Sequence, residues 1–96
     1  MSDTHAMAQL RSDLLTALYK KTPSPLNRDQ LMELCRTKFL TRDKAWYSDA
    51  VIEQLKVLHQ ASLIRPFNGG YILTDTGKRD RQQAARFMRQ QPKDAA

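Results

Sequence analysis

The chain has 96 residues, of which 41% are hydrophobic and 27% are charged. A chain of this length forms one domain with one modest core, and no apolar run approaches the roughly 20 residues that a membrane-spanning helix needs. Lysine and arginine number 16 against 10 aspartates and glutamates, so the net charge is +6. Residues 78–93 hold six cations and one acid, which leaves only +1 for the rest of the chain. This excess favours a polyanionic partner, most simply nucleic acid, and predicts that the C-terminal helix supplies most of the attraction.

Neither the N-terminus nor the cysteine content indicates secretion. Residues 1–5 lack the basic and apolar regions of a secretory signal, and Cys35 has no second cysteine with which to form a disulfide. We therefore expect a cytoplasmic protein.

The first predicted helix covers Met7–Lys20. Leu10, Leu14, Ala17 and Leu18 form an apolar stripe, and Leu15 widens it. The Thr-Pro-Ser-Pro sequence at 22–25 ends the helix, because proline lacks a donor and forces the preceding residue out of helical geometry. We expect residues 1–6 to form a flexible N-terminus.

A second helix is predicted to begin after Asn27, a favourable N-cap, with Asp29 complementing the helix dipole in the first turn. Leu31, Leu34 and Cys35 are expected to face inward. The single cysteine is then a buried core thiol.

The connection to the third helix is less regular, with Phe39 and Leu40 as its expected anchors. Thr41 and Ser48 are alternative N-caps for the third helix, and the sequence does not decide between them. Adjacent helical residues lie about 100° apart, so we expect Tyr47 to pack in the core and Trp46 to lie at its rim.

The stretch Ser48–Gly77 carries the strongest pattern in the chain. Its helical part is apolar on one face, at Val51, Leu55 and Leu58, and polar on the other, at Glu53, Gln54 and Lys56. The period then changes to two, so Ile64–Phe67 and Tyr71–Thr74 are predicted to pair antiparallel across Asn68-Gly69-Gly70, residues that tolerate positive φ.

Pro66 places the first of these strands at a sheet edge. The last helix is predicted to start at Thr74 or Asp75, with Ala84, Phe87 and Met88 as its apolar stripe. We expect residues 92–96 to form a flexible tail.

The inventory of reactive side chains is small. His5 and His59 have no partners at metal-ligand spacing, and no glycine-rich phosphate loop precedes a helix. The sequence therefore predicts no catalytic site, no metal and no cofactor.

The motifs Leu-x-x-Leu, Ala-Ser-Leu-Ile-Arg and Gly-Tyr-Ile-Leu-Thr-x-x-Gly follow one another between Val51 and Gly77. This order resembles the winged helix-turn-helix domains of small bacterial repressors, including the metal-sensing and multidrug-sensing families. The resemblance implies an α+β, mostly helical fold with three helices, a two-stranded wing and a C-terminal helix, over residues 7–91.

The resemblance also implies that the third helix enters the major groove and that the hairpin tip touches the neighbouring backbone or minor groove of duplex DNA. We therefore expect a non-enzymatic DNA-binding protein, a small transcriptional regulator of bacteria, their plasmids or phages. Asp49 and Glu53 depart from this pattern, because carboxylates repel phosphates. The expected DNA-binding residues are Arg42, Lys44, Ser48, Gln54, Lys56, Arg65, Asn68, Lys78, Arg79 and Arg81.

The acidic residues on the DNA-facing side of the third helix keep an alternative open, in which the same scaffold binds a protein partner through the third helix and Trp46. The resemblance further implies a homodimer through the first helix and the C-terminal helix, with Leu15 meeting Phe87 and Met88. The other interpretation is that these side chains complete the core of the monomer.

Overall fold

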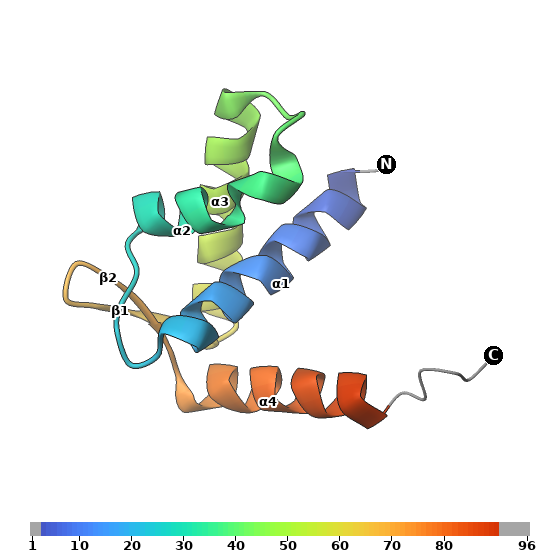
Figure 1. The fold of residues 1–96 in the computed structure, drawn as a ribbon. Helices are drawn as coiled ribbons and strands as arrows, with labels where there is room; N and C mark the ends of the chain where they lie inside the picture. The colour runs from blue at the N-terminus through green and yellow to red at the C-terminus, as the bar shows by residue number, and fades with distance from the viewer. Residues whose placement is uncertain (1–2, 91–96) are drawn as a thin grey trace.

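The computed structural model describes residues 3–90. Within this range the fold is α+β and mostly helical, as expected, with four α-helices, one short 3-10 helix and a two-stranded antiparallel sheet (Figure 1). None of these helices is both long and apolar enough to cross a membrane. The elements in chain order are α1 (Asp3–Lys21), α2 (Arg28–Cys35), η1 (Arg36–Phe39), α3 (Lys44–Gln60), β1 (Ile64–Phe67), β2 (Gly70–Leu73) and α4 (Asp75–Gln90).

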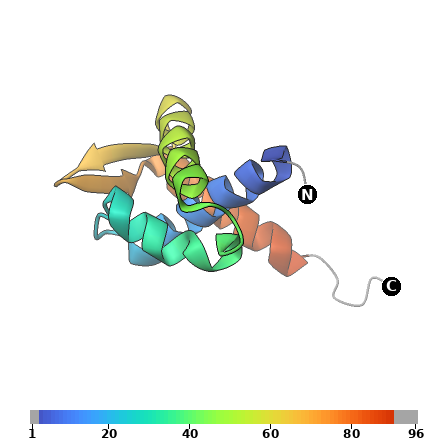
Figure 2. The ribbon, with the colours of Figure 1, turned by 90° about the horizontal axis from the view of Figure 1, so that it is seen from above.

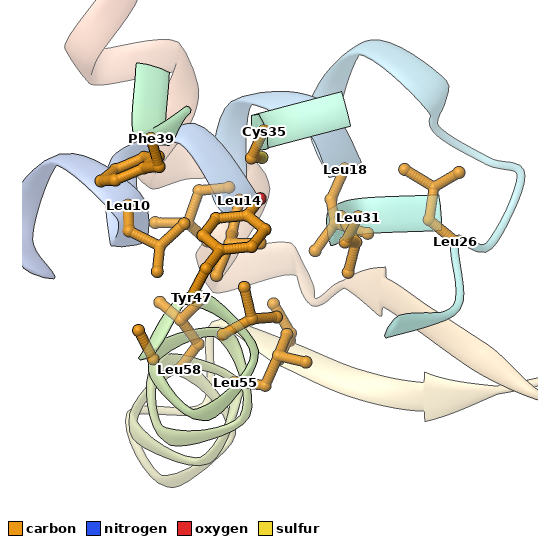
Figure 3. Close-up of a cluster of buried hydrophobic side chains, with 14 of the residues drawn as sticks. Leu10, Leu14, Leu18, Leu26, Leu31, Cys35, Phe39, Tyr47, Leu55 and Leu58 are labelled. Carbon is orange, nitrogen blue, oxygen red and sulfur yellow. The ribbon is translucent and has the colours of Figure 1, made fainter. Parts of the chain in front are cut away.

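The core forms where α1, α2 and α3 pack against one another. Leu10, Leu14 and Leu18 line the inner face of α1 and are at most 1% exposed. Tyr47 of α3 points into these leucines (Figure 3). The other buried apolar residues are Ala6, Leu15, Leu26, Leu31, Cys35, Phe39, Ala50, Val51, Leu55, Leu58, Ile64 and Leu73.

The first helix begins earlier than the sequence predicted. It starts at Asp3 rather than Met7, and Ala6 is 1% exposed within the core, so the expected start of the first helix at Met7 is wrong. Ala6 continues the stripe of Leu10 and Leu14 by one further four-residue step, which explains why this part of the chain packs. Leu15 is also buried, at 3% exposure, and therefore contributes to the core of the monomer.

The second helix has the predicted cap but not the full predicted inner face. The Asn27 side chain accepts from the Gln30 backbone N–H, and the Gln30 side chain accepts from the Asn27 N–H, forming a capping box. Leu31 and Cys35 are buried as expected, whereas Leu34 is 48% exposed. The inner line of this short helix runs through Leu31 and Cys35, one turn apart, and Leu34 points to the side of it.

The connection between α2 and α3 corrects two expectations. Phe39 is buried at the end of η1, but Leu40 is 65% exposed and anchors nothing in the core. The N-cap of α3 is neither Thr41 nor Ser48 but Asp43, whose carboxylate accepts from the Trp46 backbone N–H at 3.3 Å. A carboxylate at this position caps the helix and also complements its dipole.

The predicted hairpin is present, but its second strand runs over Gly70–Leu73 instead of Tyr71–Thr74. β1 therefore pairs antiparallel to β2 from Ile64↔Leu73 to Phe67↔Gly70, one residue away from the predicted register. Asn68 (φ +49°) and Gly69 (φ +78°) form the two-residue turn in the left-handed region. The outer edge of β2 is bridged to Leu26, so Pro66 lies on the free edge strand, as predicted.

The last helix starts at Asp75, one of the two predicted positions. The Thr74 hydroxyl accepts from the Gly77 N–H at 3.1 Å and donates to the Ser62 carbonyl, so Thr74 ties the start of α4 to the end of α3. The helix packs on α1 and β2, and it passes beneath α1 in the view from above (Figure 2). Ala84 is half-buried. The side chains of Phe87 and Met88, and the expected tail at 92–96, lie outside what the structure describes.

Candidate nucleic-acid interface

The outer side of α3 is open along its length. The inner line of the helix, from Tyr47 to Leu58, is covered by α1 and α2, and the opposite line is not. We call this exposed line the α3 surface. Its members are the exposed Asp49, Glu53, Lys56 and His59 and the half-buried Ser48 and Ile52. The exposed Lys44 precedes this surface at the start of the helix, where it lines a hollow with Asp29 and Glu33 of α2.

The charges along α3 balance one another. Lys44 lies in its first turn and Lys56 lies nearer its end, with Asp49 and Glu53 between them. Within residues 3–90 none of these four side chains makes an ion pair, and each therefore remains available to a partner. The helix therefore offers two cations that attract phosphates and, between them, a pair of carboxylates that accept hydrogen bonds.

The hairpin lies beside the α3 surface and projects from the helical body (Figures 1 and 2). Arg65 is exposed on β1, with its guanidinium carbon 5.4 Å from the centre of the Phe67 ring, and Asn68 is exposed at the tip. Backbone hydrogen bonds between Leu26 and Tyr71, at 3.1 and 2.8 Å, tie the hairpin to the segment before α2. This tie fixes the position of the hairpin relative to the helices.

A shallow groove separates α3 from the hairpin. It is lined by Arg28, Ile52, Leu55, Lys56, His59 and Tyr71. Sequence reasoning did not assign His59 or Tyr71 to the interface, because the pairing of Leu26 with Tyr71 joins segments 45 positions apart and leaves no short-range signal. Arg28 and Lys56 face this groove from different helices, so it offers cations on two sides.

Gln54 was predicted to contact DNA, and this prediction is wrong. The residue is 4% exposed, and its side-chain oxygen accepts from Arg11 Nε at 2.8 Å. Gln54 lies one turn from Ala50 and from Leu58, on the inner line of α3, so it joins α3 to α1 inside the molecule. A polar residue on that line is tolerated because Arg11 donates a hydrogen bond to its side-chain oxygen.

Arg81 was also predicted to contact DNA, but in the structure its side chain joins α4 to α1. Its Nη1 donates to the hydroxyls of Ser12 and Thr16 at 3.2 and 3.3 Å, and its Nη2 is 2.7 Å from the Asp80 carboxylate. Lys78 is half-buried and Arg79 is exposed. The basic helix α4 thus packs mainly on α1 and β2 rather than on α3.

Replacement of Arg81 by alanine tests this structural role. We expect Arg81→Ala to loosen α4, because two charge-assisted hydrogen bonds to α1 are lost, and amide hydrogen exchange in residues 78–84 to become about tenfold faster. Arg79→Ala, which removes an exposed cation from the same helix, is the control and leaves exchange unchanged. Equal exchange rates in the two variants would contradict the role assigned to Arg81.

An aromatic cluster lies at the start of α3. The Arg42 guanidinium carbon is 4.5 Å from the centre of the Trp46 ring, and the centres of the Trp46 and Phe39 rings are 6.3 Å apart. Trp46 is half-buried at the rim and Tyr47 is buried, as predicted. The Tyr47 hydroxyl donates to the Met32 carbonyl at 2.7 Å, and burial raises the pKa of this hydroxyl far above its usual value, so it remains a donor at neutral pH.

Cys35 is buried in the core at 5% exposure, as predicted. Within the described residues, no three His, Cys, Asp or Glu side chains are grouped closely enough to hold a metal ion. Comparison of the chain with protein-family models, with curated proteins and with solved structures gave no significant match.

Proposed function

We propose that this chain is a winged helix-turn-helix DNA-binding protein, a small non-enzymatic transcriptional regulator that reads duplex DNA with α3 and the hairpin. The arrangement that most supports this proposal is the open α3 surface with the hairpin beside it. Both elements carry cations that make no ion pair within the described residues. The element order of three helices, a hairpin and a last helix agrees with that of winged helices.

In this proposal α3 lies in the major groove, which is about 12 Å wide and admits a helix. Lys44 and Lys56 contact phosphates on either side, and Ser48 faces the base edges. Arg65 and Asn68 reach the neighbouring backbone from the hairpin, while Arg28 adds a contact from the start of α2. These residues lie on α2, α3 and the hairpin.

The net charge of +6 supports a polyanionic partner. In the same proposal the exposed cations of α4, such as Arg79, act at long range, because this helix packs on α1 and β2. Attraction of this kind raises the association rate and is screened by salt.

Titration of mixed-sequence duplex DNA at two salt concentrations tests the proposal. Four phosphate contacts, from Arg28, Lys44, Lys56 and Arg65, predict that the logarithm of the affinity falls with the logarithm of salt concentration with a slope of about −3.6. Binding that cannot be detected even at low salt would contradict DNA binding by this surface.

A protein-binding function is the second candidate, and a specific feature favours it. Trp46 at the start of α3 is stacked by Arg42, Leu40 is exposed in the preceding connection, and tryptophan and arginine dominate binding hot spots. In that case Asp49 and Glu53 meet cations of a protein partner rather than DNA bases. Absence of DNA binding, together with loss of partner binding in Trp46→Ala, is the result that this second candidate predicts.

A further inference from the structure

A groove follows the crevice between α1 and α2. Asp29 and Glu33, on the α2 side of this groove, also line a hollow that they share with Lys44 and Tyr47 of α3. Two hollows, of about 620 and 250 Å³, lie along the groove and share Lys21 and Leu34. We call this feature the α1–α2 groove.

The floor of the α1–α2 groove is apolar. Pro25, Leu26 and Leu34 line the larger hollow, and Leu34 and Ala17 line the smaller one. Leu34 is 48% exposed at the place where the two hollows meet. A leucine that lies open within a hollow, rather than on a convex surface, provides an anchor for apolar side chains of a partner.

The two walls of the groove carry opposite charges. Lys20 and Lys21, in the last turn of α1, form the basic part of one wall, which also carries Asp13 two turns earlier, and Asp29 and Glu33 on α2 form the acidic wall. Within residues 3–90 none of the side chains of Lys20, Lys21, Asp29 and Glu33 makes an ion pair or a hydrogen bond inside the molecule. The groove therefore offers two rows of unpaired charge of opposite sign on either side of an apolar line.

Such a surface is complementary to itself. A two-fold axis that runs along the groove brings each wall of one copy against the opposite wall of the other copy, and it brings Leu34 against Leu34. We propose that a second copy of this chain docks in the α1–α2 groove, with Lys20 and Lys21 of each copy facing Asp29 and Glu33 of the other. The charges of an unrelated partner need not be complementary to both walls. A second copy related by the two-fold axis is complementary to both.

This interface differs from pairing through α1 and α4, and it does not depend on the proposed function. The residues that line the α1–α2 groove come from α1, residues 24–26, α2 and η1, whereas the proposed DNA contacts on α3 and the hairpin come from other elements. The oligomeric state is measured without DNA, and failure of one proposal leaves the other standing.

Charge exchange across the groove tests the proposal. Sedimentation of the full chain at a series of concentrations is expected to show a monomer–dimer equilibrium. Lys21→Glu and Glu33→Lys, both on exposed residues, are each expected to raise the dimer dissociation constant at least tenfold, because each change places like charges opposite one another twice in the dimer. An equimolar mixture of the two variants is expected to form a heterodimer, because both contacts then pair opposite charges.

Lys56→Glu on the α3 surface is the matched control, and it leaves the wild-type equilibrium unchanged. A wild-type chain that stays monomeric at every concentration would overturn the proposal. So would a dimer that both single variants retain, or variants that fail to associate when mixed. Circular dichroism of each variant checks that the fold is preserved.

Discussion

Replacement of Gly77 by alanine is expected to destabilise the protein by about 3 kcal/mol. Gly77 is buried in the first turn of α4, and a Cβ atom there would overlap the Leu63 carbonyl oxygen and lie 3.1 Å from the Leu73 side chain. The carbonyl has little freedom to move, because it accepts from the Thr74 N–H at 3.0 Å. The substitution therefore forces α4 away from the hairpin. Urea denaturation followed by circular dichroism measures the loss.

Gly69→Ala is the matched control for this change. Gly69 has φ +78°, and a Cβ atom at this position would have no other atom within 4 Å, so alanine there meets only backbone strain, about 1 kcal/mol. The difference between the two variants isolates the steric contact. If Gly77→Ala costs no more than Gly69→Ala, the close packing of α4 on the hairpin is wrong.

Charge reversal on the α3 surface and the hairpin is expected to have the largest effect on DNA binding. The double variant Lys56→Glu, Arg65→Glu removes two phosphate contacts from different elements and adds two repulsive charges. We expect at least about 100-fold weaker binding to duplex DNA at moderate salt, with a salt slope shallower by about 2 units. Fluorescence anisotropy at several salt concentrations gives both quantities.

A double variant of α4 with the same change of net charge provides the comparison. Arg79→Glu, Arg86→Glu alters two exposed cations of a helix that packs on α1 and β2. We expect a loss of less than about fivefold, because these charges act only through screened long-range attraction. Equal losses in the two double variants would show that net charge, and not the α3 surface, determines the affinity.

The elements of this chain were predictable because each has a short-range signal. The four-residue steps of Leu10, Leu14 and Leu18 determine which face of α1 is buried, and Asn27 and the Asn-Gly pair at 68–69 mark a helix start and a turn by local geometry. These features do not depend on contacts with distant parts of the chain. The existence of the helices and of the hairpin was therefore predicted correctly.

The roles of individual polar side chains were less predictable, because they depend on distant partners. Gln54 is buried because Arg11 reaches it across 43 positions, and Arg81 is engaged because Ser12 and Thr16 lie on the helix against which α4 packs. Leu34 has the spacing of a core residue but no neighbouring helix covers it. Sequence periodicity indicates which residues share a face and does not indicate what covers that face.

Chemical-shift mapping with a short duplex tests DNA recognition by this protein most directly. Titration of DNA into the isotope-labelled protein is expected to shift the backbone amides of residues 44–59 on α3 and of residues 65–71 in the hairpin. The amides of the α1 residues that line the α1–α2 groove, such as Asp13, Ala17 and Lys20, are expected to remain unchanged. Shifts confined to α4, or no shifts at low salt, would contradict recognition of duplex DNA by α3 and the hairpin.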